Sequence, residues 1–423
     1  MKRITALFLL IIMAVLSLSS CKDTDVTPNN TVDSVIPTLS TEVTDTISTE
    51  TPLPDAKNKI FVASNSTYIY NNMYFYTKAW INDINSPYVT GIKYQYLDDI
   101  TDTGHNIFDA SIGQTDIFTQ YNIQSIKSLA VDREATNQNN GVPVLIICCK
   151  IKGNENHSFL SYNMANNKLT VILDNTEISS SMSRFYIYGD LIYYLVYAKN
   201  ENGSNATKVR SIKKDGTDLR EYDISFDIAN PSFTFYNDKI YYTKDVTIDQ
   251  HLYVADINFE NSRVFTEIKN IANPPKIKNG YIYYLDNTRN VVIDGISSTV
   301  YDLYRRSLDD YENSSPEILI PGIRNYYLAG SKVIYYTKDD VVKIEGMNFD
   351  YVEPHILRCY DTQTDTHTKL IVENKEKESM VNIFRVSDDF LIYEKGPYQP
   401  DAPRVFFSVD LNTGEVYSFP SKL

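Results

Sequence analysis

The chain contains few of the residues that form disulfide bonds in small secreted domains or bind metal ions. Its 423 residues include only four cysteines, five histidines and one tryptophan. No CxxC pair and no Cys/His spacing typical of zinc occurs, so the sequence indicates neither a disulfide framework nor a zinc module. Cys148 and Cys149 are neighbours in an apolar segment, and Cys359 stands alone. We expect these three thiols to be buried as small hydrophobic side chains.

The common catalytic and phosphate-binding motifs are also missing. The sequence contains no GxSxG, HExxH, GxxxxGK[ST] or EF-hand pattern. The stretch DDITDTG at 98–104 resembles a calcium loop only loosely, because Ile100 stands where an oxygen ligand is needed, and we interpret it as a turn. We therefore predict a chain with no cofactor and no metal.

Positive charge is in deficit. The 40 lysines and arginines are outnumbered by 54 aspartates and glutamates, which gives a formal net charge of −14. Such a chain repels the phosphates of nucleic acids and the headgroups of anionic lipids. We expect no nucleic-acid partner.

The N-terminus reads as an export signal. Lys2 and Arg3 precede an apolar run from Ile4 to Leu18 that is short for a membrane-spanning helix. Residues 1–21 end in Leu-Ser-Ser-Cys, which resembles the lipobox of bacterial lipoproteins, and this resemblance implies acylation of Cys21. An ordinary signal peptide or a short membrane anchor is the alternative. We expect an extracytoplasmic protein, attached to the bacterial cell membrane or cell surface through its N-terminal lipid only.

The next segment, 22–58, is rich in Thr, Ser, Pro and acidic residues. It offers too little apolar surface to pack, so we predict a disordered tether. A flexible chain of this length has a mean end-to-end distance of about 30–36 Å.

Short stretches rich in Ile and Tyr recur about every fifty residues along the rest of the chain, a period typical of propellers and solenoids. The seven copies are MYFYTK (73–78), VLIICCK (144–150), LIYYLVY (191–197), KIYYTK (239–244), YIYYLD (281–286), VIYYTK (333–338) and FLIYEK (390–395). Most follow a strand and a two-residue turn such as Asn-Asn, Gly-Asp or Asn-Gly, as tight hairpins require. A second hairpin follows several copies, for example at 209–222 and 356–372.

These repeats predict an all-β fold, a single β-propeller over residues 59–423 built from four-stranded antiparallel blades. Seven blades is the favoured count, with six or eight as alternatives. This count requires the stretch 125–175 to form a full blade despite its divergent REATNQNNG turn. Tyrosine doublets at 241–242 and 335–336 are expected to fill the space between blades. How the ring closes is left open by the sequence.

The IYYTKD strand, together with the DGTDL turn at 215–219, resembles the bacterial relatives of YWTD-type propellers. These are low-density-lipoprotein-receptor-like domains of unknown function on bacterial lipoproteins. The resemblance covers residues 59–423 and implies the propeller fold without implying an activity. Such propellers usually have six blades.

Long, dissimilar connections join the second and third strands of several units, and in an up-and-down blade they emerge on one face of the ring. They lie at 78–90, 199–207, 286–299, 338–355 and 394–404. Binding residues usually lie on variable loops carried by a rigid scaffold. The predicted ligand-binding residues are the aromatics Trp80, Tyr88, Tyr351 and Tyr398 and their polar partners Arg289, His355 and Gln399.

The sequence favours a monomeric, non-catalytic binding module for an envelope protein, peptide or glycan. The alternative is a carbohydrate-active enzyme, a glycoside hydrolase or lyase that uses loop carboxylates. Candidate carboxylates are Asp83, Asp286, Asp294, Glu345, Asp350, Glu353 and Asp401. With 54 acidic residues, several must fall in any set of loops, so a solvated surface is the favoured interpretation of them. An assembly or structural role is a third reading.

Overall fold

A computed structural model describes residues 60–418, apart from several short segments. The segments outside the description are 63, 66, 81–88, 100, 103, 109–120, 179–184, 200–202, 204, 227–232, 244–249, 269–274, 345–350, 373–378 and 398–404. The predicted signal at 1–21, with Cys21, and the predicted tether at 22–58 also lie outside it. Residues Leu53–Leu423 form one compact unit.

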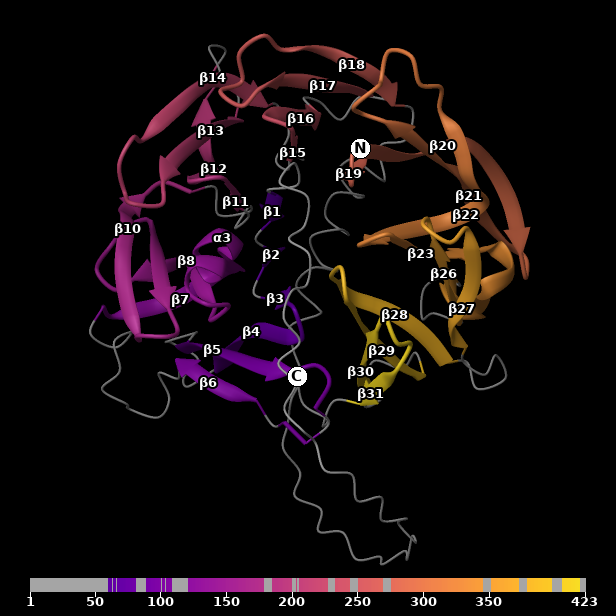
Figure 1. Cartoon of the computed structure of the whole chain (residues 1–423), viewed down its shortest axis with the longest axis horizontal. Helices are drawn as coiled ribbons and strands as arrows, with labels where there is room; N and C mark the ends of the chain where they lie inside the picture. The colour runs from indigo at the N-terminus through magenta and orange to yellow at the C-terminus, as the bar shows by residue number, and fades with distance from the viewer. Residues whose placement is uncertain are drawn as a thin grey trace, which may run out of the picture. The chain divides into compact units, whose positions relative to one another are not determined.

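Within this unit the sheets follow one another around a ring, as Figure 1 shows. Five sheets each contain four consecutive antiparallel strands, and two of these gain a further short strand. The sets are β3 (Thr67–Tyr70), β4 (Met73–Trp80), β5 (Val89–Tyr96) and β6 (His105–Phe108); β7 (Ile123–Val131), β8 (Val144–Ile151), β9 (His157–Asn163) and β10 (Lys168–Thr176); β11 (Phe185–Tyr188), β12 (Leu191–Lys199), β13 (Asn205–Lys213) and β14 (Arg220–Phe226); β15 (Phe233–Tyr236), β16 (Lys239–Thr243), β17 (Gln250–Asp256) and β18 (Arg263–Ile268); and β28 (Ser379–Val386), β29 (Phe390–Pro397), β30 (Val405–Asp410) and β31 (Val416–Ser418). The predicted all-β propeller of four-stranded antiparallel blades is confirmed.

A sixth sheet is larger, with seven strands. It consists of β19 (Lys276–Lys278), β20 (Tyr281–Ile293), β21 (Ile296–Ser307), β22 (Glu317–Ala329), β23 (Lys332–Thr337), β26 (Ile356–Asp361) and β27 (Thr366–Val372). Strand β22 pairs with β21 from Glu317 to Ile323 and with β23 from Ile323 onward. Because this strand continues without a break, the described residues form six sheets of four or more strands rather than seven separate ones.

The stretch with the divergent turn does form a full blade, β7–β10. The divergent turn is a loop that contains the only α-helix of the described residues, α3 (Arg133–Gln138). Asp132 caps this helix by accepting a hydrogen bond from the Ala135 N–H. Lys214, in the turn of the next blade, donates to the Asp132 carboxylate at 2.8 Å, so the helix is tied to its neighbour.

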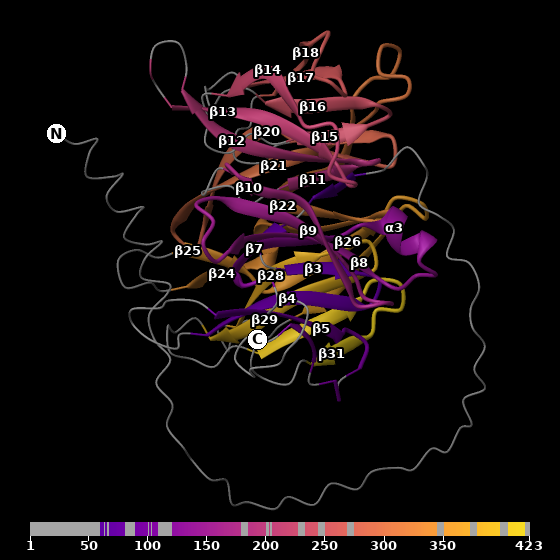
Figure 2. The ribbon, with the colours of Figure 1, turned by 90° about the vertical axis from the view of Figure 1, so that its left-hand side faces the viewer.

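The same backbone hydrogen bond recurs around the ring. In each case, the N–H at the turn between the third and fourth strands donates to the carbonyl that ends the turn between the first and second. The pairs are Leu97–Asn72, Met164–Pro143, Lys214–Asp190, Leu308–Gly280, Thr362–Ser331 and Leu411–Asp389, at 2.7–3.1 Å. Both turns of a unit therefore lie on one face, which we call the short-turn face. Figure 2 shows α3 on this face and the hairpin of β24 (Val341–Ile344) and β25 (Tyr351–Pro354) on the opposite, long-loop face.

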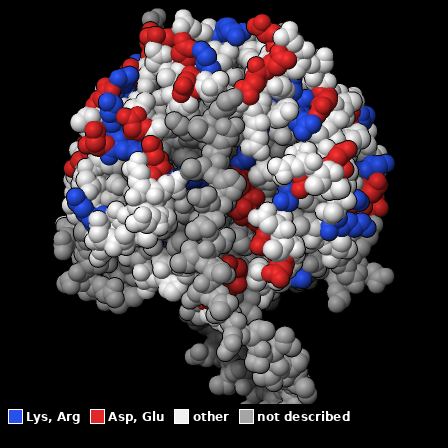
Figure 3. Space-filling model, viewed as in Figure 1, with Lys and Arg blue, Asp and Glu red and all other residues white. Residues whose placement is uncertain are grey.

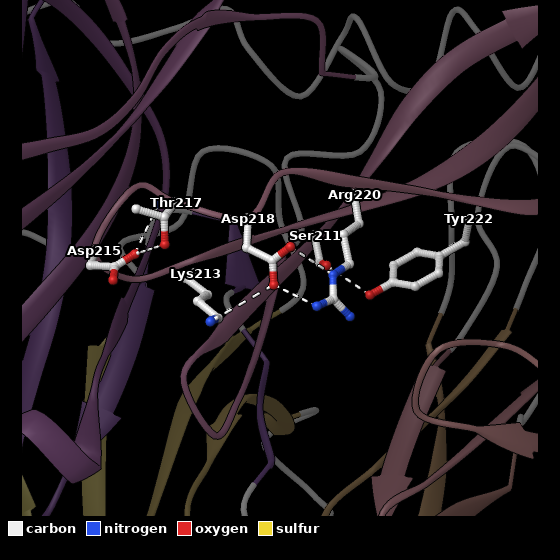
Figure 4. A network of polar contacts seen from close by, with 7 residues as sticks. All are labelled: Ser211, Lys213, Asp215, Thr217, Asp218, Arg220 and Tyr222. Atoms are coloured by element: carbon white, nitrogen blue, oxygen red, sulfur yellow. Dashed lines mark hydrogen bonds and ion pairs between the residues drawn. The ribbon is translucent and has the colours of Figure 1, made fainter.

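The turns of the short-turn face satisfy their own polar groups. In the DGTDL turn, Asp215 accepts hydrogen bonds from the N–H and hydroxyl of Thr217, and Asp218 pairs with Arg220 (Figure 4). Gly216 has a φ of +84°, and a Cβ there would lie 2.7 Å from the carbonyl oxygen of Ile172 in the preceding blade. Glycine is thus required by both the backbone conformation and the blade contact.

Tyrosine and phenylalanine fill the space between blades, as expected. Tyr242 is fully buried, with the rings of Phe226 and Phe259 within 6 Å of its own. Tyr241 and Tyr335 are also buried, while Tyr336 is half-buried. The three thiols of Cys148, Cys149 and Cys359 are buried and free, as predicted.

The ring closes by side-chain packing between the first and last blades. Ile69, Tyr74 and Leu97 of the first blade pack with Phe390 and Ile392 of the last in one apolar cluster. The Ser408 hydroxyl donates to the Leu97 carbonyl at 2.6 Å. The N-terminal strands β1 (Ile60–Val62) and β2 (Ser64–Asn65) pair with β11 and β7, not with the last blade.

Candidate functional site

Two hairpins build the elaborated part of the long-loop face among the described residues: the extension of β20–β21 in the seven-stranded sheet, and the separate two-stranded sheet β24–β25. The first corrects a prediction, because residues 286–299 are not a loop. Strands β20 and β21 continue to a two-residue turn at Asp294–Gly295, whose φ values are 48° and 83°. An Asp-Gly pair flanked by apolar residues is a strong hairpin signal, and the sequence carried it.

The second hairpin, β24–β25, occupies much of the stretch 338–355 and is pinned at its base by a buried ion pair. A short 3-10 helix, η2 (Lys338–Asp340), precedes it. The fully buried Asp340 carboxylate accepts hydrogen bonds from the Thr337 hydroxyl at 2.7 Å and from two nitrogens of Arg358 at 2.6 and 2.7 Å. The Asp340 carbonyl accepts the His355 N–H at 2.9 Å. Both ends of the hairpin are therefore held at one point.

The two hairpins pack against each other through a small apolar cluster. Its buried members are Ile293 from the first hairpin and Val341 and Val352 from the second, with Tyr336 against them. The elaborated part of the long-loop face is thus a built substructure with its own core.

Polar groups with unmet bonding capacity lie beside this cluster. Arg324 of β22 donates through Nη1 to the Val352 carbonyl at 3.4 Å, while its buried Nε has no hydrogen-bond partner within the described part of the chain. Burial raises the pKa of Glu353, and the nearby Arg324 guanidinium opposes that shift only in part. Burial also raises the pKa of Tyr327, helped by Glu353, and that of Tyr336, to about 12.

We refer to Arg324, Tyr327, Tyr336 and Glu353 as the Arg324 cluster. It offers a guanidinium donor, a carboxyl group and two phenols beside apolar surface. Arg324 acts on Glu353 through its charge, and no ion pair or hydrogen bond between these two side chains is found within the described ranges. Such a set can bind a ligand that carries both hydrogen-bond donors and acceptors.

The sequence did not point to Arg324, Tyr327 or Tyr336, because the repeat pattern placed all three in blade strands. Tyr336 was expected in the core as half of a doublet. Its half-buried position follows from the β24–β25 hairpin, which covers the end of β23. Only Glu353 was named beforehand, as one of many loop carboxylates.

Arg289 is placed on the first hairpin, where it is already paired. Its guanidinium makes two hydrogen bonds with the buried Asp302, at 2.6 and 2.9 Å. Asp302 also accepts from Asn287 and from the Gly322 N–H. The bonds from Arg289 lower the pKa of Asp302 to about 2. Arg289 therefore fixes the hairpin, although 42% of its side chain stays exposed.

Of the other predicted binding residues, one is buried, and the side chains of the rest lie outside the described part of the structure. His355 is buried at the base of the β24–β25 hairpin, so its ring is not an exposed polar partner. Tyr351 begins β25 opposite Ile344, and Trp80 ends β4 opposite Val89, but the description does not extend to their side chains. Tyr88, Tyr398 and Gln399 lie outside the described residues.

Across the part of the chain that the structure describes, no cluster of three or more His, Cys, Asp or Glu side chains is arranged to hold a metal ion. Among the described residues of the DDITDTG stretch, Asp102 accepts hydrogen bonds from the N–H groups of Tyr96 and Gly104. None of the helices within the described ranges has the length and apolar character needed to cross a membrane.

Comparison with known proteins supports the fold. No family model matches the sequence, and no curated protein matches it. Among solved structures, the chain is similar to Pyrococcus horikoshii acylaminoacyl peptidase, with 12% identity, a TM-score of 0.50 and coverage of 87% of this chain and 54% of that one. A post-proline cleaving enzyme from Rickettsia typhi gives 10% identity, a TM-score of 0.50 and coverage of 87% and 53%.

The β-propeller domain of the Trilobed protease from Pyrococcus furiosus gives 14% identity, a TM-score of 0.41 and coverage of 66% and 80%. The chain spans about half the length of the first two peptidases. At 10–12% identity, the similarity to these two peptidases shows a shared fold and does not establish an activity.

Proposed function

We propose that the chain is a non-catalytic binding module, anchored through Cys21 on the extracytoplasmic side of a bacterial membrane, that binds a protein, peptide or glycan through its long-loop face. The observation that carries the binding role is the Arg324 cluster beside the packed hairpins of that face. A peptide segment suits the cluster best, because its backbone supplies carbonyls for Arg324 and N–H groups for Glu353. Tyrosine rings beside the charged groups add apolar contact area.

We further propose that the ring has seven blades, with the seven-stranded sheet counting as two. The recurring turn-to-turn hydrogen bond supports this count, because it occurs twice in that sheet, at Gly280 and at Ser331. Strand β22 would then serve as the outer strand of one blade up to Ile323 and the inner strand of the next. We also propose that the chain is related to the YWTD-type propellers of bacterial lipoproteins, as the resemblance in its sequence implies.

The alternative, a carbohydrate-active enzyme, is favoured by one observation, the raised pKa of the Glu353 carboxyl. A protonated carboxyl could act as a general acid. However, burial alone causes the upward shift, which Arg324 opposes, and no second acidic residue contributes to it. A glycosidase of the usual kind needs two carboxyl groups on either side of the glycosidic bond that it cleaves. We therefore favour a non-catalytic binding role.

Arg324→Gln and Glu353→Gln should each weaken ligand binding by about tenfold or more, because each removes a charged hydrogen-bonding partner. The ligand would first be identified by screening peptide and glycan arrays with the protein, and affinity then measured by calorimetry. Arg220→Gln, on the outer strand β14, is the matched control and should bind like the parent. Unchanged affinity in both cluster variants would contradict the assignment. Turnover of a polysaccharide that Glu353→Gln abolishes would support the enzyme instead.

Trp80→Ala tests the other predicted part of the face. Large rigid aromatics carry a disproportionate share of contact energy, so the variant should lose about 2 kcal/mol of binding free energy. Its melting temperature should stay close to that of the parent. A destabilised variant whose folded molecules bind with full affinity would show that Trp80 is a packing residue.

Cys21→Ala tests the anchor. Acylation of Cys21 would hold the parent in the membrane fraction, and the variant should be released or misprocessed. Membrane fractionation with detection of a C-terminal tag measures the difference. A variant that stays as membrane-bound as the parent means that lipidation of Cys21 is wrong.

A further inference from the structure

The first described residues of the chain lie along the inner edges of two blades. Strand β1 pairs antiparallel with β11, the inner strand of its blade, and β2 pairs antiparallel with β7, the inner strand of the preceding one. Figure 1 shows β1, β2 and β3 in succession toward the middle of the ring. The chain thus joins the ring from its central side, not from its outer rim.

The register of these strands shows in which direction the chain runs between the two faces of the ring. Ile60 lies opposite Tyr188, the last residue of β11 before its tight turn on the short-turn face, and Val62 lies opposite Tyr186, further from that turn. Ser64 and Asn65, opposite Leu129 and Ser128, continue away from the short-turn face. Strand β3 then runs back toward the turn at Asn71. The chain therefore enters the ring at the short-turn face.

The last described strand runs the other way. Strand β31 follows the turn after Asp410, on the short-turn face, with Val416 opposite Val409 and Ser418 opposite Phe407. Its end is thus directed toward the long-loop face. Attachments before Ile60 and after Ser418 leave from opposite faces of the ring.

We infer that an N-terminal anchor holds the ring by its short-turn face and presents the long-loop face, with the Arg324 cluster, away from the membrane. The partner is then a protein or peptide that approaches from the far side of the ring, not a lipid of the anchoring bilayer. This orientation rests on the proposed function for the presence of an anchor.

Charge on the short-turn face agrees with this orientation. Figure 3 shows this face with acidic side chains gathered beside its centre. The turns there expose Asp98, Asp99 and Glu415, and Asp389 lies half-buried in another. Like charge keeps this face off an anionic bilayer. The face that is nearer the membrane is thus held at tether distance and does not dock on it.

Orientation can be measured by energy transfer to a labelled bilayer. Single cysteines would be introduced by Val292→Cys, near the tip of the β20–β21 hairpin, and by Gln363→Cys, in the exposed turn between β26 and β27 on the short-turn face. All variants carry Cys21→Ala, and the buried native thiols leave the introduced cysteine as the reactive one. The protein from residue 21 onward is bound to neutral vesicles that contain acceptor-labelled and nickel-chelating lipids.

A histidine tag is placed either before residue 21 or after Leu423. Val292 lies near the far end of the 13-residue strand β20, which begins beside the short-turn face, so the two dye positions differ by roughly 35 Å in height. With the N-terminal tag, transfer from position 363 should exceed transfer from position 292 by about twofold or more, since that height difference is a large part of the transfer range. Moving the tag to the C-terminus should remove or reverse the difference.

Equal transfer from both positions with the N-terminal tag, or greater transfer from position 292, would overturn the inferred orientation. The tagged protein needs neither acylation of Cys21 nor a ligand. Failure of this experiment is therefore distinct from failure of the anchor or of ligand binding, which the Cys21→Ala and Arg324→Gln variants test.

Discussion

Replacing Arg358 by alanine is expected to lower the free energy of unfolding by about 3–5 kcal/mol, the usual cost of removing one partner of a buried ion pair. Arg358 makes two hydrogen bonds to Asp340, whose side chain is fully buried, so the variant would leave a carboxylate in the interior without its counter-charge. Denaturant unfolding at neutral pH measures the loss. The β24–β25 hairpin should loosen as well, because Asp340 holds both of its ends.

The deficit should depend on pH in a defined direction. Burial alone would raise the pKa of Asp340, but hydrogen bonds from Arg358 and Thr337 outweigh it and hold the pKa below its ordinary value. In the parent, this pair stabilises the fold above the pKa of an unfolded aspartate, about 3.9, and the stabilisation is lost as pH falls through the lower folded value.

Without Arg358, burial dominates and the pKa of Asp340 rises. The loss in the variant should therefore be largest at neutral pH and shrink as the carboxyl becomes protonated. Arg220→Ala, which breaks the exposed pair with Asp218, should change stability little at any pH. An Arg358→Ala variant as stable as the parent at pH 7 would mean that the pair does not hold the hairpin.

The blade strands could be predicted because their signal is local and repeated. Each of the seven predicted second strands is a strand in the structure, from β4 to β29. A tyrosine-rich strand after a two-residue turn encodes its own hairpin, and repetition strengthens the pattern. The stretch 125–175 also forms a four-stranded blade, as the repeat predicted, despite the inserted helix.

Connectivity between units was harder to predict, because it depends on where pairing stops. Strand β22 changes partner at Ile323, directly after Pro321 and Gly322, yet it continues through both residues, so the separation expected between two units is absent. The pairing of β1 with β11 joins residues far apart in the chain. No local pattern announces such a pairing.

The Arg324 cluster shows why the candidate site was only partly predictable. Loop length pointed to the face on which the cluster lies, and the insertion at 338–355 contributed Glu353. Arg324 and Tyr327 lie on β22. The β24–β25 hairpin places the Val352 carbonyl next to Arg324 and the Glu353 carboxyl near Tyr327. Conversely, the sequence predicted that Arg289 and His355 bind a ligand, but Arg289 is paired with Asp302 and His355 is buried.

Replacing Tyr242 by alanine is expected to cost about 3–5 kcal/mol, the range for truncating a large buried aromatic. Its side chain is fully buried among Phe226, Phe233 and Phe259 between two blades, and those neighbours cannot close the cavity without moving strands of both. Tyr242 also shares a hydrogen bond with the Ser262 hydroxyl. Thermal and denaturant unfolding, analysed together, measure the loss.

Two further variants separate the cavity from the hydroxyl group. Tyr242→Phe keeps the ring and removes the hydroxyl group that bonds to Ser262, so it should cost about 1 kcal/mol. Tyr281→Ala removes a ring that is 37% exposed and touches Arg305, and it should cost less than about 1 kcal/mol. If Tyr242→Ala were no more destabilising than Tyr242→Phe, the ring would not be filling the space between blades. The tyrosine repeat would then need an explanation other than packing.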